Sequence, residues 1–371
     1  MPKIHHGTSN MKKNMLLALC SIFFALVALE ITLRLITHQP VPPSGPKTNW
    51  AIVPERVWTE YHPDLGWYHQ KNKKAFLRKN GFEIEVNTNS QGFRGSREYS
   101  IEKPKGVKRI LVLGDSFVFG WGVRDHETFC SKLEQQYKNW EAIDLGVAGF
   151  GIDQILMSYR SIGQKFKPDV VVISIFPEDF WRATRTFSDS GYAKPYFSLT
   201  PSGDLELNNV PVPKPFELRY NQFPEIIQQN SLEKLLIQSL VYRKLKLALI
   251  RLGKNLGWVD PDSTGEWILG RAILNQLVRE IQQNNAKPIL LVIPPHRWFL
   301  RKNYESIHKS ILRLAKREGF ELIDATEPFR EAINRSSLED YYIKDDWHWT
   351  EKGHELVSKL ITERIKKMEL Q

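Results

Sequence analysis

The stretch RILVLGDS, residues 109–116, decides the fold class of this chain. Its first part is apolar and ends at Gly114-Asp115-Ser116, a pattern that predicts a buried strand followed by a tight turn. A second run, DVVVISIF over residues 169–176, is almost continuously apolar, as expected of a strand that is covered on both faces of a sheet. Because helices cover both faces of parallel sheets, the two runs indicate an α/β fold.

Strands and helices alternate around these two runs. The spacing of apolar residues predicts, in order, strand 109–113, helix 127–138, strand 142–145, helix 151–166, strand 169–176, helix 266–284, strand 288–293, helix 303–318, strand 321–324 and a helix from Thr350. This alternation predicts a doubly wound parallel sheet with helices on both faces. Ligands of such sheets bind at the carboxyl ends of the strands, so we expect the functional residues in the loops that follow them.

The chain is predicted to divide into five parts. These are a cytoplasmic N-terminus at 1–14, an apolar helix at 15–36, a proline-rich linker at 37–50, a small β-rich extension at 51–106 and the main domain at 107–371, which carries an insertion at about 186–263. In the insertion, Pro, Asn and Gly residues interrupt the alternation of strands and helices.

The apolar segment 15–36 is predicted to cross a membrane once. At ~1.5 Å per residue a helix of this length extends about 33 Å, which is enough for the ~30 Å hydrocarbon core of a bilayer. Lys12 and Lys13 favour a cytoplasmic N-terminus, which predicts that the main domain is periplasmic or extracellular. The alternatives are a cleaved signal peptide, a lipoprotein signal ending at Cys20, in which Leu19 is too bulky, and a buried helix.

The composition excludes several classes of protein. Hydrophobic residues make up 42% and charged residues 25% of 371 residues, which excludes a collagen, a coiled coil and a wholly disordered chain. The net charge of +10 is scattered without a basic stripe, so nucleic acid is not a predicted partner. The only cysteines, Cys20 and Cys130, exclude a disulfide scaffold and a multi-cysteine zinc module, and no metal or organic cofactor is predicted. The oligomeric state stays open.

Ser116 is a candidate nucleophile because it directly follows a predicted buried strand. A serine at this place is held where its hydroxyl reaches a ligand, although serines also cap helices there without further function. A serine becomes a strong nucleophile when a base takes its proton and a carboxylate orients that base. The segment DDWHWTEKGH, residues 345–354, offers both, because Asp345 and Asp346 precede His348 on a loop that leads into a helix.

Two other histidines are weaker candidates for the base. His296 follows the predicted strand 288–293 and therefore lies at the same edge of the sheet. His354 falls on the last helix, beyond the loop, and is predicted to have a structural role.

Four segments, taken in order, resemble the SGNH/GDSL hydrolase superfamily. They are LGDSFVFGWGV (113–123), DLGVAGFGIDQ (144–154), DVVVISIFPEDF (169–180) and DDWHWTEKGH (345–354). HPDLGWY (62–68), NTNSQGFRG (87–95) and the N-terminal apolar segment resemble, more narrowly, membrane-anchored bacterial members. The resemblance implies a flavodoxin-like doubly wound sheet of the SGNH hydrolase type.

The resemblance also implies roles for individual residues. Ser116 is implied as the nucleophile, His348 as its base, and the backbone N–H groups of Ser116 and Gly149 as donors of the oxyanion hole. The spacing Asp-x-x-His selects Asp345 as the partner of His348, whereas relatives with Asp-x-His-Trp select Asp346. Asp345 is narrowly preferred.

One position departs from the family pattern. Where the third motif has an asparagine that donates its amide to the oxyanion, this chain has Glu178, followed by Asp179. An ionised carboxylate only accepts hydrogen bonds, and loss of one oxyanion donor costs ~10²–10³ in rate. Either activity is reduced, another donor substitutes, Glu178 is protonated, or the protein is no efficient hydrolase.

The expected function is a serine esterase that hydrolyses an ester, such as an O-acetyl group on a cell-envelope glycan. Its expected partners are this acylated substrate and, through the N-terminal helix, a membrane. The alternatives are an O-acyltransferase that modifies a polysaccharide and a catalytically weak carbohydrate-binding module, which the many aromatic residues favour.

Overall fold

The computed structural model of the chain describes residues 7–37, 58–79, 82–188, 192–214, 261–300 and 305–369, together with residues 239, 241, 242, 245, 248 and 249. The chain forms two units, one made of residues 1–44 and 228–260 and the other of residues 45–227 and 261–371. Most of the predicted linker at 37–50 and much of the predicted insertion lie outside the described residues.

The first unit contains the helix α1 (Gly7–Thr37), which includes the apolar segment predicted over 15–36. Glu30 in α1 accepts hydrogen bonds from the Ser239 hydroxyl and the Val241 N–H, each at 2.9 Å. Across the described part of the chain, no helix combines the length and the apolar character that crossing a membrane requires, so the predicted membrane anchor is not confirmed. The location of the main domain outside the cytoplasm stays a prediction.

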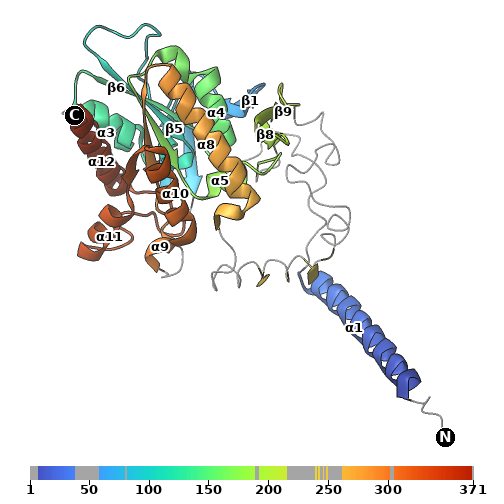
Figure 1. Cartoon of the computed structure of the whole chain (residues 1–371). Helices are drawn as coiled ribbons and strands as arrows, with labels where there is room; N and C mark the ends of the chain where they lie inside the picture. Colours follow the sequence, from blue (N-terminus) through green and yellow to red (C-terminus); the bar gives the residue numbers. More distant parts are fainter. Residues whose placement is uncertain are drawn as a thin grey trace, which may run out of the picture. The chain divides into compact units, whose positions relative to one another are not determined.

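The second unit is built on a five-stranded parallel sheet (Figure 1). Its strands lie in the order β6 (Trp140–Gly146), β5 (Lys108–Gly114), β7 (Val170–Ile175), β10 (Lys287–Val292) and β11 (Glu321–Asp324). When only the five strands of this sheet are numbered in chain order, their spatial order is 2-1-3-4-5. This is the order of the flavodoxin-like doubly wound fold. The predicted parallel α/β sheet is therefore confirmed, and every predicted strand is present with bounds close to those expected.

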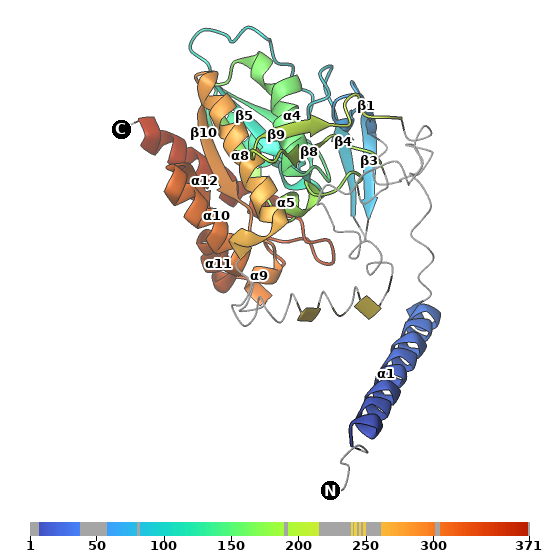
Figure 2. The same ribbon diagram turned by 45° about the vertical axis from the view of Figure 1, so that its right-hand side comes forward.

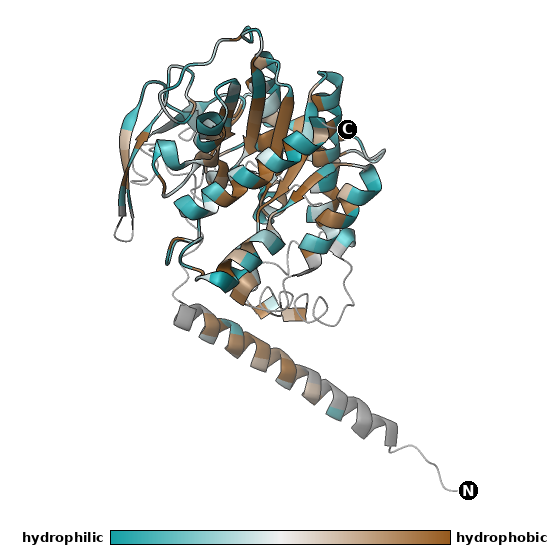
Figure 3. Ribbon diagram, turned by 90° about the vertical axis from the view of Figure 1, so that its left-hand side faces the viewer, coloured by the Kyte–Doolittle hydropathy of each residue, from teal (hydrophilic) through white to brown (hydrophobic). Residues whose placement is uncertain are grey.

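Helices cover both faces of the sheet, as its apolar strands require. One layer contains α4 (Ile152–Ser161), α8 (Gly265–Gln283) and α10 (Glu305–Glu318), and the other contains α3 (Phe129–Gln136), α11 (Thr326–Arg335) and α12 (Glu351–Glu369). Along β5, Leu111 and Leu113 are buried under the first layer, and Ile110 and Val112 under the second. Figure 3 shows the strands of the central sheet as mainly hydrophobic, whereas the helices carry hydrophilic residues on their outer faces.

Short antiparallel hairpins stand beside the sheet (Figure 2). The segment predicted as a β-rich extension contains two of them, β1 (Thr59–His62) with β2 (Gly66–His69) and β3 (Lys74–Lys79) with β4 (Phe82–Asn87). A third, β8 (Tyr196–Leu199) with β9 (Leu205–Asn208), lies in the predicted insertion. Trp67 and Phe93 of the extension are fully buried in the same apolar cluster as one face of the sheet, so the extension and the sheet share a core.

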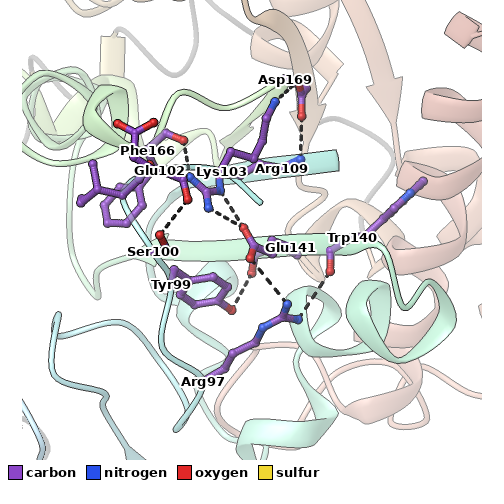
Figure 4. Close-up of polar contacts among 12 residues, drawn as sticks. Arg97, Tyr99, Ser100, Glu102, Lys103, Arg109, Trp140, Glu141, Phe166 and Asp169 are labelled. Carbon is purple, nitrogen blue, oxygen red and sulfur yellow. Dashed lines mark hydrogen bonds and ion pairs between the residues drawn. The ribbon is translucent and has the colours of Figure 1, made fainter. Parts of the chain in front are cut away.

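A buried polar network ties the end of the extension to the amino ends of β5 and β6 (Figure 4). The fully buried Arg109 donates to Glu141 at 2.7 Å and to the carbonyl oxygens of Ile101 and Phe166 at 3.1 and 2.6 Å. Arg97 forms a further ion pair with Glu141 at 3.8 Å. Because a buried charge is tolerated only when it is paired, this network fixes the last residues of the extension at the amino ends of the strands.

Candidate active site

Ser116 lies at the carboxyl end of β5, where it opens the short helix α2 (Ser116–Phe119). The Asp115 side chain caps α2 by accepting a hydrogen bond from the Phe117 N–H at 3.0 Å. A Cβ at Gly114 would lie 2.4 Å from Val118 Cγ2, so only glycine allows the helix to start this close to the strand. The sequence Gly-Asp-Ser therefore positions the serine by local sterics and capping.

Three side chains form a hydrogen-bonded row at this point. His348 Nε2 lies 2.8 Å from Ser116 Oγ, and His348 Nδ1 lies 2.6 Å from Asp346 Oδ1. Because a carboxylate only accepts hydrogen bonds, Nδ1 carries the proton and Nε2 accepts from the Ser116 hydroxyl. This is the arrangement in which an imidazole can take the proton of a serine nucleophile.

The narrow preference for Asp345 as the partner of His348 is corrected, because the structure places Asp346 against Nδ1. The segment turns sharply, with positive φ angles at Asp345 (60°) and Trp347 (79°), and the Ile343 N–H closes it by donating to the His348 carbonyl at 2.8 Å. This turn leaves Asp345 exposed and buries Asp346 beside the imidazole. Spacing in the sequence alone does not reveal such a turn.

Trp121 also contacts the Asp346 carboxylate, and the sequence analysis does not predict this contact. Its indole N–H donates to Asp346 Oδ2 at 3.3 Å, and its ring lies 5.6 Å from the His348 ring. The Phe117 ring packs against the imidazole as well, at 4.9 Å. A tryptophan between two glycines in the motif that carries Ser116 is the sequence signal that would have found it.

The N-terminal extension holds the loop that carries Trp121. Arg94 is buried, pairs with Asp125 at 2.5 Å, and donates to the carbonyl oxygens of Phe119 and Val123 at 3.2 and 2.8 Å. Arg94 belongs to the segment NTNSQGFRG, and the sequence alone does not indicate this role. The geometry therefore connects the extension to the catalytic end of the sheet.

The predicted oxyanion donors follow neighbouring strands. Gly149 lies after β6 with a φ of +80°, and the Val147 N–H donates to the Gly114 carbonyl at 3.1 Å, which joins the two strand ends. The Trp67 indole donates to the Ala148 carbonyl at 3.2 Å and fixes this loop. In the described part of the chain, the N–H groups of Ser116 and Gly149 donate no hydrogen bond. Their role in an oxyanion hole stays a prediction.

Glu178 opens the short helix α5 (Glu178–Arg182) after β7 and forms an ion pair with Arg297, the first residue of α9 (Arg297–Leu300). Next to it, the buried Asp179 pairs with Arg182 at 2.8 Å, and Arg182 also pairs with Asp115 at 2.9 Å. Burial, together with the nearby Asp115, raises the pKa of Asp179 well above its usual range. The Arg297 partner was not predicted, because it comes from a different loop.

The two remaining histidines have other contacts. The His296 ring stacks on Trp347 with centroids 3.8 Å apart, and burial beside Arg297 lowers its pKa. His354 accepts a hydrogen bond from the Phe129 N–H at 3.2 Å, so its expected structural role agrees with the structure. Over the described ranges, no three His, Cys, Asp or Glu side chains gather in a way that could hold a metal.

The part of the chain that contains this site is similar to a known protein family. Residues 112–356, more than half of the chain, match the model of the GDSL-like lipase/acylhydrolase family. Comparison with curated proteins gives no match.

Similar solved structures include a psychrotrophic esterase from Pseudoalteromonas sp. inhibited by monoethylphosphonate, with 15% identity, 71% of this chain and 100% of that chain covered, and a TM-score of 0.40. Another is a catalytic mutant of an acetylxylan esterase from Geobacillus stearothermophilus, with 14% identity, coverages of 71% and 96%, and a TM-score of 0.40.

Proposed function

Since the chain belongs to the GDSL-like lipase/acylhydrolase family and is a hydrolase that acts on ester bonds, we propose that Ser116, His348 and Asp346 form its catalytic triad. The observation that carries this proposal is the pair of hydrogen bonds on the His348 ring, at 2.8 Å to Ser116 Oγ and 2.6 Å to Asp346 Oδ1. Ser116 is 232 residues away from His348 in the sequence, so the fold brings it to the other two groups.

In the proposed mechanism, Ser116 Oγ attacks the acyl carbonyl while His348 Nε2 takes the hydroxyl proton. The N–H groups of Ser116 and Gly149 stabilise the negative charge that develops on the carbonyl oxygen. The imidazolium then gives its proton to the leaving alcohol oxygen, and an acyl group stays on Ser116. Water attacks this acyl-enzyme with His348 as the base, which releases the acid and restores the serine. Asp346 stabilises the imidazolium in both halves.

The finer part of the proposal concerns the substrate, an O-acetyl group on a cell-envelope glycan. Trp347 directly precedes His348, and its aromatic ring is exposed. An exposed aromatic ring at this place supports a substrate whose alcohol portion contains a ring, such as a sugar. Transfer of the acyl group to a sugar hydroxyl proceeds through the same acyl-enzyme, and product analysis with and without an added sugar separates the two reactions.

A fluorophosphonate probe tests the nucleophile directly. The full-length chain is expected to gain one probe mass on the peptide that contains Ser116, and Ser116→Ala is expected to lose both the labelling and the release of acetate from an acetylated polysaccharide. Unchanged turnover in Ser116→Ala would exclude the mechanism. Binding of the polysaccharide without labelling would favour the carbohydrate-binding alternative.

A further inference from the structure

Arg182, the last residue of α5, contacts the three loops that follow β5, β6 and β7. Its Nη1 donates to Asp115 Oδ2 at 2.9 Å, to the Phe150 carbonyl oxygen at 3.1 Å and to Asp179 Oδ1 at 2.8 Å. These acceptors lie after β5, β6 and β7, in that order. Because Nη1 carries only two hydrogens, at least one N–H is shared between two acceptors, so one nitrogen joins all three loops.

Each of these acceptors is adjacent in sequence to a position of the predicted oxyanion hole. The adjacent pairs are Asp115–Ser116, Gly149–Phe150 and Glu178–Asp179. In the proposed mechanism, the N–H groups of Ser116 and Gly149 must point at the same carbonyl oxygen, although they belong to different loops. A misplacement of about 1 Å in a reacting geometry can cost ~10² in rate. A side chain that joins the loops is therefore expected to affect the reaction.

The backbone of Arg182 is held by further contacts. The buried Lys194 ammonium donates to the Arg182 carbonyl at 2.9 Å and forms an ion pair with the buried Asp153, the second residue of α4. A Cβ at Gly151 would lie 2.8 Å from Arg182 Cβ, so glycine allows the loop after β6 to pack directly on α5. These contacts fix α5 against the loop that carries Gly149.

We propose that Arg182 is a positioning residue that aligns the N–H groups of Ser116 and Gly149 on one carbonyl oxygen. Arg182 acts through Asp115 and Phe150 rather than by contact with the substrate. The inference rests on the proposed esterase function, because an oxyanion hole acts in that reaction. Arg182 is expected to affect kcat rather than KM, since the charge on the carbonyl oxygen develops only in the transition state.

Arg182→Met tests the inference, because methionine keeps the apolar part of the side chain and removes all three hydrogen bonds. We expect kcat for 4-nitrophenyl acetate to fall about 10²-fold, while KM stays within about twofold of the wild-type value. Steady-state kinetics measure both, under conditions in which urea denaturation shows that the variant is folded. An unchanged kcat, or a higher KM with an unchanged kcat, would overturn the inference, since Arg182 would then not act on the transition state.

Arg182→Lys separates the geometry from the charge. The lysine keeps a positive charge between Asp115 and Asp179, but its ammonium ends one atom short of the Nη position and lacks the planar fork. We expect this variant to be more stable than Arg182→Met and to have a similarly low kcat. Wild-type kcat in Arg182→Lys would overturn the positioning role, because the charge alone would then suffice. This outcome decides the question also if Arg182→Met does not fold.

Arg160→Met is the matched control for the loss of a partly buried arginine. Arg160 forms an ion pair with Glu280, which joins α4 to α8 rather than the loops at the carboxyl ends of the strands. Its kcat and KM are expected to stay near the wild-type values. A fall in kcat equal to that of Arg182→Met would overturn the inference, because the effect would then not be specific to the three loops.

Hydrogen exchange separates this inference from the esterase function. The N–H groups of Phe117 and Phe150 each donate a hydrogen bond within one of the loops, at 3.0 and 3.1 Å. In Arg182→Met, NMR is expected to show that both amides exchange faster, by more than the change in the free energy of unfolding explains. If the wild type turns over no ester but this exchange depends on Arg182, the proposed function fails and the positioning of the loops holds. Unchanged exchange at both amides overturns the inference.

Discussion

The indole N–H of Trp121 donates a hydrogen bond to Oδ2 of Asp346 at 3.3 Å, while Oδ1 of the same carboxylate lies 2.6 Å from His348 Nδ1. The carboxylate is therefore held by two partners at once. Its orientation decides the tautomer and the direction of the imidazole, which in turn decide whether Nε2 can accept a proton. Trp121 is accordingly expected to affect catalysis through Asp346.

Trp121→Phe keeps an aromatic ring and removes the N–H donor. We expect kcat for 4-nitrophenyl acetate to fall about 10- to 100-fold, the range that one hydrogen bond to a charged group provides. In an Asp346→Asn background the same substitution is expected to have a much smaller effect, since the carboxylate that it orients is gone. Steady-state kinetics of the wild type, both single variants and the double variant measure this coupling.

Trp58→Phe is the control for the loss of an indole. Trp58 is buried and stacks on Phe119, and its N–H has no hydrogen-bond partner within the described residues. The kcat of the Trp58→Phe variant is expected to stay near that of the wild type. An equal loss from Trp121→Phe in both backgrounds would mean that Trp121 acts by packing alone.

The choice between the two neighbouring aspartates is a second test of the geometry. Asp346→Asn is expected to lower kcat by roughly 10⁴, because an asparagine stabilises the wrong imidazole tautomer. Asp345→Asn is expected to leave kcat almost unchanged, since Asp345 is exposed and Nδ1 already faces Asp346. Comparable losses from both variants would contradict the observed arrangement.

The parallel sheet was predictable because its strands are buried on both faces. Most positions of β5 and β7 are therefore apolar, and this leaves a strong local signal in the sequence. Ser116 and His348 were also predictable, because the strand end, the glycine before the serine and the family motifs agree. In contrast, α11 was not predicted, since it is short and mostly polar, and few of its residues reach the core.

The contacts between distant loops were not predictable. The choice of Asp346 depends on a turn with two positive φ angles at non-glycine residues, for which the sequence has no reliable signal. The pairing of Glu178 with Arg297 depends on how β7 and β10 lie next to each other in the sheet. Such contacts follow from the fold as a whole rather than from any local pattern.

Arg94 is expected to stabilise the fold strongly, because it is buried and holds both Asp125 and the loop after α2. Arg94→Met removes the charge and the donors and leaves their partners unsatisfied. We expect the free energy of unfolding to fall by about 3 kcal/mol, as for other broken buried ion pairs. Urea denaturation at neutral pH measures this change.

Arg78→Met is the matched control for Arg94. Arg78 forms an exposed ion pair with Glu83, and solvent screening leaves such pairs with little effect on stability. If Arg94→Met proves as stable as Arg78→Met, the extension does not depend on Arg94 for its attachment to the catalytic end of the sheet.

His354 is expected to make the protein sensitive to acid. Burial is the main cause that lowers its pKa from 6.5 to about 3, with smaller effects from nearby positive charges. Between these two pH values the unfolded chain binds a proton at His354 that the folded protein does not bind. The contribution of His354 to stability is therefore complete above pH 6.5, and the free energy of unfolding falls as the pH decreases below it.

His354→Gln removes this titration and keeps an acceptor for the Phe129 N–H. As the pH falls below 6.5, the free energy of unfolding of the variant is expected to rise relative to that of the wild type by ~1.4 kcal/mol per pH unit. This slope corresponds to one proton per molecule. Urea denaturation of both proteins at pH 7, 6 and 5 measures the difference, in which the titrations of all other groups cancel. A difference that stays constant over this range would mean that the folded protein accepts the proton at His354, and that the histidine is not held in its neutral form by burial.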